Sequence, residues 1–374
     1  MGWRLISDDG VSASFGLAAD DLLARRVGHG QSPPTLRLYT YRSHCALVGR
    51  FQRVEHEIHL DFCRAQRIPV NRRPTGGGAI IMGADQLGVA LTLPGRGGET
   101  YQGARALMAH FSEGIVRGLA GLGVKARFRR KNDIEVDGRK IVGLGIYRAA
   151  SGGLLFHASL LVDLDVPLML QILNTPFEKI SDKEIATVSA RTSTVRREVG
   201  RQVTLDAVRR QVAAGYAAAF DVELVPGDFT PGERRAAAAL EREKYLTDGW
   251  VHQTTEVPDA VGAARVKTPG GLLDVRLTLA GQMMKAVFIS GDFFAAEKAV
   301  ADLEASLRWH TSRVEAVEAT LGQVYERWPL ELEAIPLAAL SRAIQQAVRR
   351  AGLVEAKTRS DPYGCFVTPG GSRG

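Results

Sequence analysis

Residues 76–78 are three consecutive glycines, and they stand directly behind Arg72-Arg73-Pro74-Thr75 in an otherwise apolar region. Glycine destabilises strands and helices, so a triple glycine indicates a place where something comes close to the backbone. The N–H groups of such a loop can form a concavity that binds an anion, and Arg73 adds a fork of donors suited to phosphate or carboxylate. The alternative is a β-bulge or a tight crossing of strands. The loop differs from the common NTPase phosphate loop, because Ala79-Ile80-Ile81 follows the glycines in place of Lys-Ser/Thr.

Lys140 is the second candidate for chemistry. It stands two residues after Asp137-Gly138, a dipeptide typical of a two-residue hairpin turn. A lysine near a turn is usually only solvated. The strand beyond it, however, is broken by Gly143 and Gly145, which permits close approach by a ligand or another strand.

Two further segments carry polar groups into apolar surroundings. His157 interrupts the apolar run LLFHASLL, where a hydrogen-bonded core histidine is the simpler interpretation. Asn132-Asp133 opens the first strand of the hairpin, where it can cap a turn or contact magnesium or a ribose.

The elements that must position these residues mix strands and helices. Alternating and 3.6-residue patterns predict strands at 35–42, 132–136, 139–148 and 154–165, two strands joined by a turn within 79–94, and helices at 15–28, 60–68, 103–123 and 204–220. Thr204 is the expected N-cap of the last helix. A proline-containing, polar stretch at 225–262 predicts a linker, followed by a hairpin at 270–294 and helices at 295–310, 312–321 and 337–351.

Composition limits the class of protein. The chain has 374 residues, enough for two domains, and an ordinary hydrophobic fraction of 45%. A net charge of +7 favours an acidic partner, although scattered arginines can also serve solubility alone. The three cysteines, Cys45, Cys63 and Cys365, form no close pair, which suits a reducing compartment. No apolar stretch approaches the roughly 20 residues that span a bilayer, and we expect a cytoplasmic protein without a membrane segment.

We therefore expect an α+β fold with two domains. The large domain, residues 1–248, holds a mixed sheet with flanking helices and every candidate site residue. A small α+β accessory domain covers residues 262–353, and residues 354–374 form a flexible tail.

The motifs together resemble one family. The segments RRPTGGGA, KNDIEVDGRKIVG and FHASLLVDLD look like three successive blocks of the lipoate-protein ligase family, within the biotin/lipoate ligase superfamily. Upstream, TLRLYTYRSHCALVGRFQ resembles the family's opening strand with its glycine, arginine and glutamine at Gly49, Arg50 and Gln52. Residues 291–294, GDFF, resemble a turn of its accessory domain. The resemblance spans residues 3–325.

The resemblance implies an enzyme that activates lipoate, or octanoate, with Mg-ATP to an acyl-adenylate and then acylates a lysine of a carrier protein. Lys140 would be catalytic, between the carboxylate oxygen and the α-phosphate. Asp133 would be a candidate Mg²⁺ contact. The substrate- and ATP-binding residues would be Arg73, Gly76, Gly77, Gly78, Ala79, Ile80, Ile81, Gln86, Asn132, Asp133, His157 and Ser159.

Three positions depart from the family pattern. Ile81-Met82-Gly83, Gly143-Leu144-Gly145 and His157-Ala158-Ser159 replace the usual Tyr-His-Asp, Gly-Ser-Ala and His-Gly-Thr. These changes leave open the acyl chain preference and the carrier, which can be an acyltransferase subunit of a 2-oxoacid dehydrogenase, a glycine-cleavage H protein or a related lipoyl carrier.

Two alternatives to the ligase compete. The first is an octanoyl or lipoyl transferase of the same fold that works without ATP; such relatives use a cysteine nucleophile, and here no cysteine lies between Cys63 and Cys365. The second is a non-catalytic binder of lipoate or nucleotide. We expect no nucleic-acid partner, because the candidate catalytic region begins almost at residue 1, and we expect a monomer.

Overall fold

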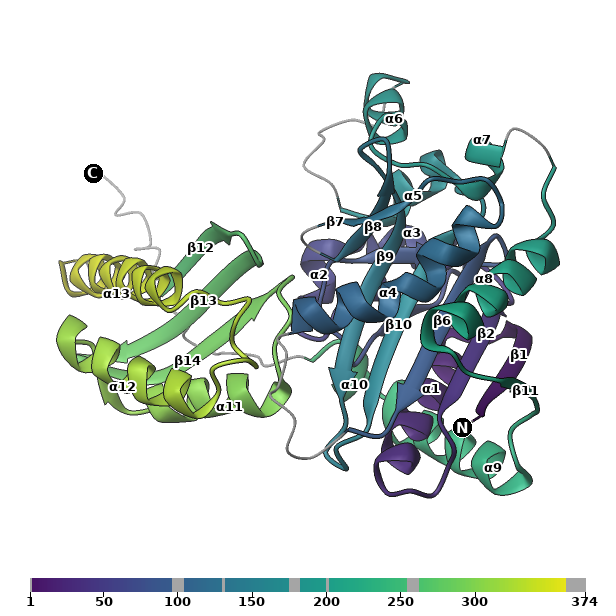
Figure 1. The fold of residues 1–374 in the computed structure, drawn as a ribbon. Helices are drawn as coiled ribbons and strands as arrows, with labels where there is room; N and C mark the ends of the chain where they lie inside the picture. The colour runs from purple at the N-terminus through teal and green to yellow at the C-terminus, as the bar shows by residue number, and fades with distance from the viewer. Residues whose placement is uncertain are drawn as a thin grey trace. The chain divides into compact units, whose positions relative to one another are not determined.

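A computed structural model describes residues 2–95, 104–129, 132–174, 182–199, 202–253 and 262–360 of the chain. The chain divides into two compact units (Figure 1). The first unit consists of Met1–Thr254 together with Asp292–Ala296, and the second of Thr255–Gly291 and Glu297–Gly374. A short segment far along the sequence therefore belongs to the first unit.

The first unit is built on an eight-stranded sheet with the order β11-β1-β2-β6-β10-β9-β8-β7. Strand β1 pairs in parallel with β11 and β2, and the other neighbours pair antiparallel, so the expected mixed sheet is confirmed. The strands are β1 (Trp3–Val11), β2 (Thr35–Tyr41), β6 (Gln86–Leu93), β7 (Arg127–Arg129), β8 (Asp133–Val136), β9 (Arg139–Arg148), β10 (Leu154–Leu161) and β11 (Leu224–Pro226).

The hairpin between β8 and β9 forms where the sequence predicts it. Asp137 and Gly138 both have positive φ, 48° and 78°, which is the conformation of a type I′ turn. The register shifts between Ile134 and Glu135, so that Glu135 stands opposite Lys140. This irregularity lies beside the lysine that the sequence analysis singled out.

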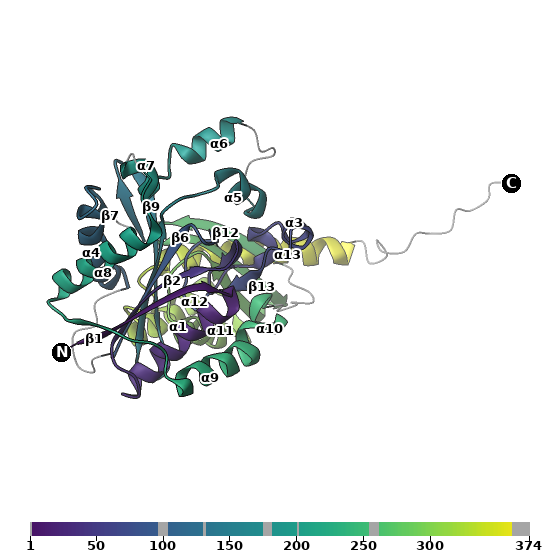
Figure 2. The ribbon, with the colours of Figure 1, turned by 90° about the vertical axis from the view of Figure 1, so that its right-hand side faces the viewer.

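Helices cover both faces of the large sheet (Figures 1 and 2). Helices α4 (Ala104–Ala120) and α8 (Leu205–Phe220) pack together on one face. The Thr204 side chain accepts a hydrogen bond from the Ala207 amide, so it caps α8 as expected. Helix α1 (Ala13–Gly28) lies on the other face, where its N-cap Ser12 accepts from the Phe15 amide.

A second, three-stranded sheet shares the α1 face. Its order is β4-β3-β5, with β3 (Cys45–Val48) parallel to β4 (Val70–Arg72) and antiparallel to β5 (Ile80–Met82). A buried cluster joins α1, β3 and β5 to β2, β6 and β10 of the large sheet through side chains such as Leu17, Leu47 and Leu155. The triple glycine connects β4 to β5. The glycine loop is therefore held over the large sheet by this core.

The remaining helices of the first unit surround this layer. They are α2 (Val54–Glu57), α3 (Leu60–Ala65), α5 (Val166–Ile172), α6 (Asp182–Ser189), α7 (Val195–Val199), α9 (Pro231–Leu240), the π-helix η1 (Glu241–Tyr245) and α10 (Asp248–Val251). The linker expected over residues 225–262 is wrong for most of its length. Tyr245 is fully buried and donates to Asp21 of α1, because the one-turn π-helix turns this ring into the core.

The second unit is a small α+β unit. Its antiparallel sheet, in the order β12-β13-β14-β15, consists of β12 (Gly262–Thr268), β13 (Gly271–Ala280), β14 (Met283–Gly291) and β15 (His310–Thr311). Its helices are α11 (Glu297–Leu307), α12 (Val314–Arg327) and α13 (Leu337–Ser360). Helix α13 runs seven residues into the expected tail, and residues 361–374 lie outside the described residues. Within the described ranges no helix is long and apolar enough to cross a membrane.

Candidate active site

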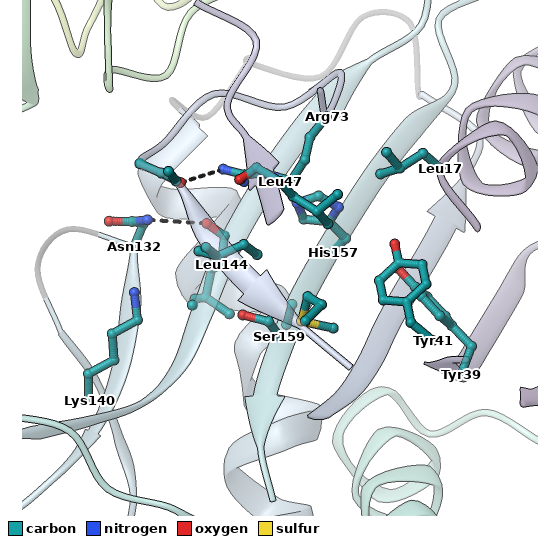
Figure 3. Close-up of a pocket in the computed structure, with 16 residues that line it drawn as sticks. Leu17, Tyr39, Tyr41, Leu47, Arg73, Asn132, Lys140, Leu144, His157 and Ser159 are labelled. Carbon is teal, nitrogen blue, oxygen red and sulfur yellow. Dashed lines mark hydrogen bonds between the residues drawn. The ribbon is translucent and has the colours of Figure 1, made fainter. Parts of the chain in front are cut away.

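A pocket opens between the large sheet, α1, the three-stranded sheet and the glycine loop (Figure 3). The space inside it is about 580 Å³, part of which is open to solvent. The pocket has one apolar side, with Leu17, Leu47 and Met82, and one polar side, with Asn132 and Lys140.

Eight of the expected site residues line this pocket. They are Arg73, Gly78, Ala79, Ile80, Asn132, Lys140, His157 and Ser159. Five do not line it: Gly76, Gly77, Ile81, Gln86 and Asp133. Ile81 is buried in a separate core cluster, because successive residues of a strand point to opposite faces. The Gln86 amide is fully buried and donates to the Asp163 carbonyl at 2.8 Å, which gives it a part in packing.

Lys140 reaches the pocket from the start of β9. Its ammonium lies 2.7 Å from Oδ1 of Asp133, and the lysine side chain is one-third exposed. Its backbone is fixed on both sides, since its amide donates to the Arg191 carbonyl and its carbonyl accepts from the Ser193 amide. The anchored lysine therefore presents a charged amine at the polar side of the pocket.

Gly143 creates the space in front of this amine. A methyl group placed on Gly143 would lie 3.1 Å from Nζ of Lys140 and 3.2 Å from Oγ of Ser159. The ammonium and the hydroxyl thus border the same small volume from two neighbouring strands. On the first strand of the hairpin, Asn132 donates to the Leu144 carbonyl at 3.3 Å and closes this side of the pocket (Figure 3).

His157 stands in the middle of the pocket floor on β10. Its Nε2 lies 2.9 Å from the Thr75 hydroxyl, which is also within 3.4 Å of the Arg73 Nε donor. Burial and the nearby Arg73 charge lower the pKa of His157 to about 3, so the ring is neutral at physiological pH. The expected hydrogen-bonded core histidine is present, although its ring also faces the pocket.

Arg73 is the pocket's buried cation. Its guanidinium donates to the carbonyls of Leu47, Gly76 and Gly78 at 2.8, 3.2 and 2.9 Å. Burial lowers its pKa to about 10, which still leaves it charged at neutral pH. Most of the Arg73 donors therefore stabilise the conformation of the glycine loop. The guanidinium binds backbone carbonyls of the protein itself.

The glycine loop itself is packed against a segment from much later in the sequence. The Gly77 amide donates to the Phe293 carbonyl at 3.4 Å, and Phe293 stacks on Phe51 with ring centroids 5.0 Å apart. A side chain on Gly76 would meet the Phe293 carbonyl oxygen at 2.2 Å. Gly77 has φ +95° and faces the Phe294 ring. The glycines thus serve close packing here, which was the alternative to the anion-binding loop.

The sequence analysis did not name Leu17, Tyr39, Tyr41 or Leu47, which line the pocket. Met82, Gly143, Leu144 and Ala158 also line it, and they lie at the three positions that depart from the family pattern. A signal for Tyr39 and Tyr41 was present, because two aromatic residues spaced by two lie on one face of the strand that the pattern predicts. Tyr39 donates to the buried Asp20, which also pairs with Arg37 at 2.8 Å, so a buried ionic network underlies this side of the pocket.

The thiols of the described residues are not reactive groups. Cys45 and Cys63 are both buried, and neither lines the pocket. Burial raises the pKa of the Cys45 thiol to about 12 and also raises that of Cys63. Cys365 lies outside the described residues.

The described part of the chain contains no group of three acidic, histidine or cysteine side chains that could hold a metal ion. Asp133, the candidate Mg²⁺ contact, is instead paired with Lys140. The donor set around the pocket therefore does not fit a magnesium site built from protein side chains alone.

Known proteins resemble the chain at both the sequence and the fold level. The family described as Lipoyl protein ligase A/B catalytic domain matches residues 12–217, more than half of the chain. Octanoyltransferase LipM of Kyrpidia tusciae is 31% identical over 273 residues, which cover 66% of this chain and 97% of that protein. Relatives from Clostridioides difficile, Symbiobacterium thermophilum and Brevibacillus brevis bear the same name.

Among solved structures, a bi-partite lipoate protein ligase of Thermoplasma acidophilum, described with its E2 lipoyl domain, has a TM-score of 0.61 at 27% identity. The match covers 67% of this chain and 96% of that one. LipL1 of P. falciparum in complex with lipoate has a TM-score of 0.67 over 86% of this chain and 94% of that one. At 15% identity it shows the fold alone.

These relatives correct the main functional expectation. The prediction of an ATP-dependent ligase that forms an acyl-adenylate is wrong, because the curated relatives are named octanoyltransferases, and this favours the alternative of acyl transfer without ATP. The expected enzyme of lipoyl-type protein modification is confirmed. The chain belongs to the lipoyl protein ligase A/B catalytic domain family.

Proposed function

We propose that this protein transfers an octanoyl-class acyl group to a lysine of a lipoyl carrier protein without consuming ATP. Acyl transfer without ATP needs an acyl group that is already activated, and a thioester on a donor carrier protein is such a group. The name octanoyltransferase in the relatives supports this reading. A carrier of the E2 lipoyl type, as named with the Thermoplasma structure, is the acceptor class that we infer.

The single observation that carries the proposal is the two-sided pocket. Its apolar side, with Leu17, Leu47 and Met82, suits a hydrocarbon chain, because each buried methylene is worth about 0.8 kcal/mol. Its polar side presents the Lys140 ammonium and the Ser159 hydroxyl around the space left by Gly143. An acyl chain bound along the pocket would place its carbonyl group at these donors.

The chemistry follows from this placement. The neutral amine of the acceptor lysine attacks the thioester carbonyl carbon, a C–N bond forms, and the C–S bond breaks. The proton leaves the amine for the departing thiolate, so the products are an amide and a thiol. Negative charge develops on the carbonyl oxygen, where an ammonium such as Lys140 is stabilising. The Asp133 carboxylate, 2.7 Å from the ammonium, holds the lysine in place at this point.

The same geometry favours direct transfer between the two carriers. Transferases of this fold use a cysteine that takes up the acyl group, but among the described residues no cysteine lines this pocket, and the two described thiols are buried. Ser159 is no substitute, because the nearest imidazole, His157, has its pKa lowered to about 3 and is a weak base. We therefore place the attack on the thioester with the acceptor lysine itself.

The test is a transfer assay on the full chain, read by intact mass. Octanoyl carried as a thioester on an acyl carrier protein is incubated with apo lipoyl domain, with and without Mg-ATP. We expect one octanoyl group on the acceptor in both cases. Acylation that requires Mg-ATP and free octanoate would overturn the proposal.

A second arm tests direct transfer. The enzyme is incubated with the octanoyl donor alone, and its own mass is measured with and without Cys365→Ser. We expect no octanoyl group on the enzyme and no effect of the substitution on transfer. An acylated enzyme that disappears in Cys365→Ser would replace direct transfer by a cysteine route and leave the overall activity standing.

A further inference from the structure

The second unit carries a large exposed aromatic side chain. Trp309 is 58% exposed. Its φ of 56° lies in the left-handed region, where a residue just after the end of a helix, here α11, commonly lies. The helix end therefore accounts for the backbone, but packing does not account for the exposed indole, and we look to binding for its role.

Neighbouring side chains extend this feature into a surface. Met284 pairs with His310 in the sheet, so Lys285 comes opposite Trp309, and the Lys285 ammonium lies 6.0 Å from the indole ring centre. Met283, which is 38% exposed, and the exposed Lys285 stand on either side of the buried Met284, where the register between β13 and β14 shifts. We call Met283, Lys285 and Trp309 the Trp309 face.

The charge around this face is positive. Arg308 and Arg313 flank it along the chain, and both side chains are exposed. Within the described residues, no carboxylate lies within ion-pair distance of Arg308, Arg313 or Lys285. Glu315 is exposed in the first turn of α12, and the cations outnumber it. An apolar centre with a cationic rim is complementary to an apolar side chain ringed by carboxylates.

The second unit lies outside the segment that matches the catalytic family. The family match ends at residue 217 and lies wholly within the first unit. Of the two protein substrates in the proposed reaction, the acyl donor is marked chemically by its thioester and acyl chain, which the pocket can recognise. The acceptor offers only a lysine amine, a group found on most proteins. Selection of the acceptor therefore needs contact with its folded surface.

We propose that the Trp309 face docks the acceptor carrier protein through an acidic surface around an apolar side chain. This proposal rests on the proposed acyl transfer for the identity of the partner. It places partner selection in the second unit and chemistry in the first. Tryptophan is the residue type most enriched among the few side chains that dominate binding energy at protein interfaces.

The test measures binding and turnover separately, using the full chain and the apo lipoyl domain of a 2-oxoacid dehydrogenase acyltransferase subunit. Calorimetry without any acyl donor gives Kd, and the transfer assay gives KM and kcat. We expect Trp309→Ala to raise Kd and KM for the acceptor roughly 10- to 30-fold with kcat unchanged at saturation. Lys285→Glu should also raise Kd and KM for the acceptor, and it should make both constants less dependent on salt concentration.

The matched control is Lys267→Glu. Lys267 is exposed on β12, the opposite edge strand of the same sheet, and the substitution makes the same change of charge. We expect it to change Kd less than twofold. If Lys267→Glu raised Kd as much as Lys285→Glu does, the change would reflect overall charge, and this would overturn the proposal.

A stability measurement separates docking from a structural role. Glycine adopts a positive φ without strain, so Trp309→Gly should raise the melting temperature of the second unit while it weakens binding. A lower melting temperature for that variant would assign Trp309 to folding and would overturn the docking role.

Three further results would also overturn the proposal. They are no measurable binding of the lipoyl domain by the wild type, a fall in kcat with Kd unchanged, and weakened binding of the octanoyl donor carrier alone. Because calorimetry needs no acyl transfer, a protein that binds the lipoyl domain through this face but transfers no octanoyl would refute the proposed function and leave the docking intact.

Discussion

Nε2 of His157 and Oγ1 of Thr75 lie 2.9 Å apart and join the floor of the pocket to the glycine loop above it. Arg73 can only donate to the threonine hydroxyl, which leaves the hydroxyl proton available for His157. The imidazole then accepts at Nε2 and remains neutral. This hydrogen bond links the pocket floor to the glycine loop, and burial beside the Arg73 cation requires the imidazole to stay neutral.

This requirement makes the protein sensitive to acid. The pKa of His157 is lowered from 6.5 in the unfolded chain to about 3 in the fold, so below pH 6.5 the unfolded state binds the proton first. Stability should then fall by up to about 1.4 kcal/mol per pH unit between pH 6.5 and 3. We expect His157→Gln to flatten this loss. Urea midpoints of both proteins at several pH values measure it, with the exposed His29→Gln as control. If the urea midpoints of wild type and His157→Gln fell in parallel with pH, His157 would not be the source of the acid sensitivity.

Lys140→Met should abolish most transfer and leave the fold intact. The change removes the ammonium from the polar side of the pocket, and losing one such contact typically costs on the order of 100- to 1000-fold in rate. Single-turnover transfer to the apo lipoyl domain measures the effect, and Lys267→Met on the exposed edge of the second unit is the control. A rate within about threefold of wild type would remove Lys140 from the mechanism.

Gly77→Val should lower stability and transfer together. The residue has φ +95°, which a β-branched side chain avoids, and a Cβ there would come within 2.9 Å of the Phe294 ring. Gly249→Ala is the control, since open space surrounds that position, its φ is not positive, and it does not line the pocket. Melting temperature and transfer rate are measured for both variants. If Gly77→Val melts like wild type, the packing described for the loop is wrong.

Phe293→Ala should destabilise the first unit, although residue 293 lies between the two segments of the second unit in sequence. Phe293 is 1% exposed and stacks on Phe51, and truncation of a buried phenylalanine typically costs about 3–5 kcal/mol. Phe288→Ala, at a half-buried site in β14 of the second unit, is the control. Hydrogen exchange of the glycine loop and β3 reports on the first unit. If Phe293→Ala made hydrogen exchange faster in the second unit alone, Phe293 would not be part of the first unit's core.

Local sequence patterns correctly predicted the strands, the hairpin and the helix start that surround the site. Alternation placed β2, β9 and β10, Asp137-Gly138 placed the hairpin, and Thr204 placed the start of α8. These features depend on residues a few positions apart. Lys140 was identified from its place just after the hairpin turn and His157 because it interrupts an apolar strand, and the fold brings both to one pocket.

Features that depend on contacts between residues far apart in sequence could not be predicted from local patterns. The donors of Arg73 turn to carbonyls of its own loop and of β3, and Phe293 comes back to the glycines from more than 200 residues away. The error in the functional prediction has the same origin. Glycine loop, lysine and histidine are shared by relatives with different chemistry, and one fold can host several reactions. The motifs therefore specified the family and left the ATP requirement undetermined.

The return of Asp292–Ala296 to the first unit means that the chain passes between the units three times, after residues 254, 291 and 296. A protease that cuts once between residues 254 and 255 would therefore not yield two independent pieces. The downstream fragment would still carry Phe293, which remains inserted between Phe51 and the glycine loop. The nicked protein should migrate as two bands in denaturing gels and as one species in solution. For a gene that encodes this chain, a stop codon after the first 254 residues would remove part of the catalytic unit along with the second.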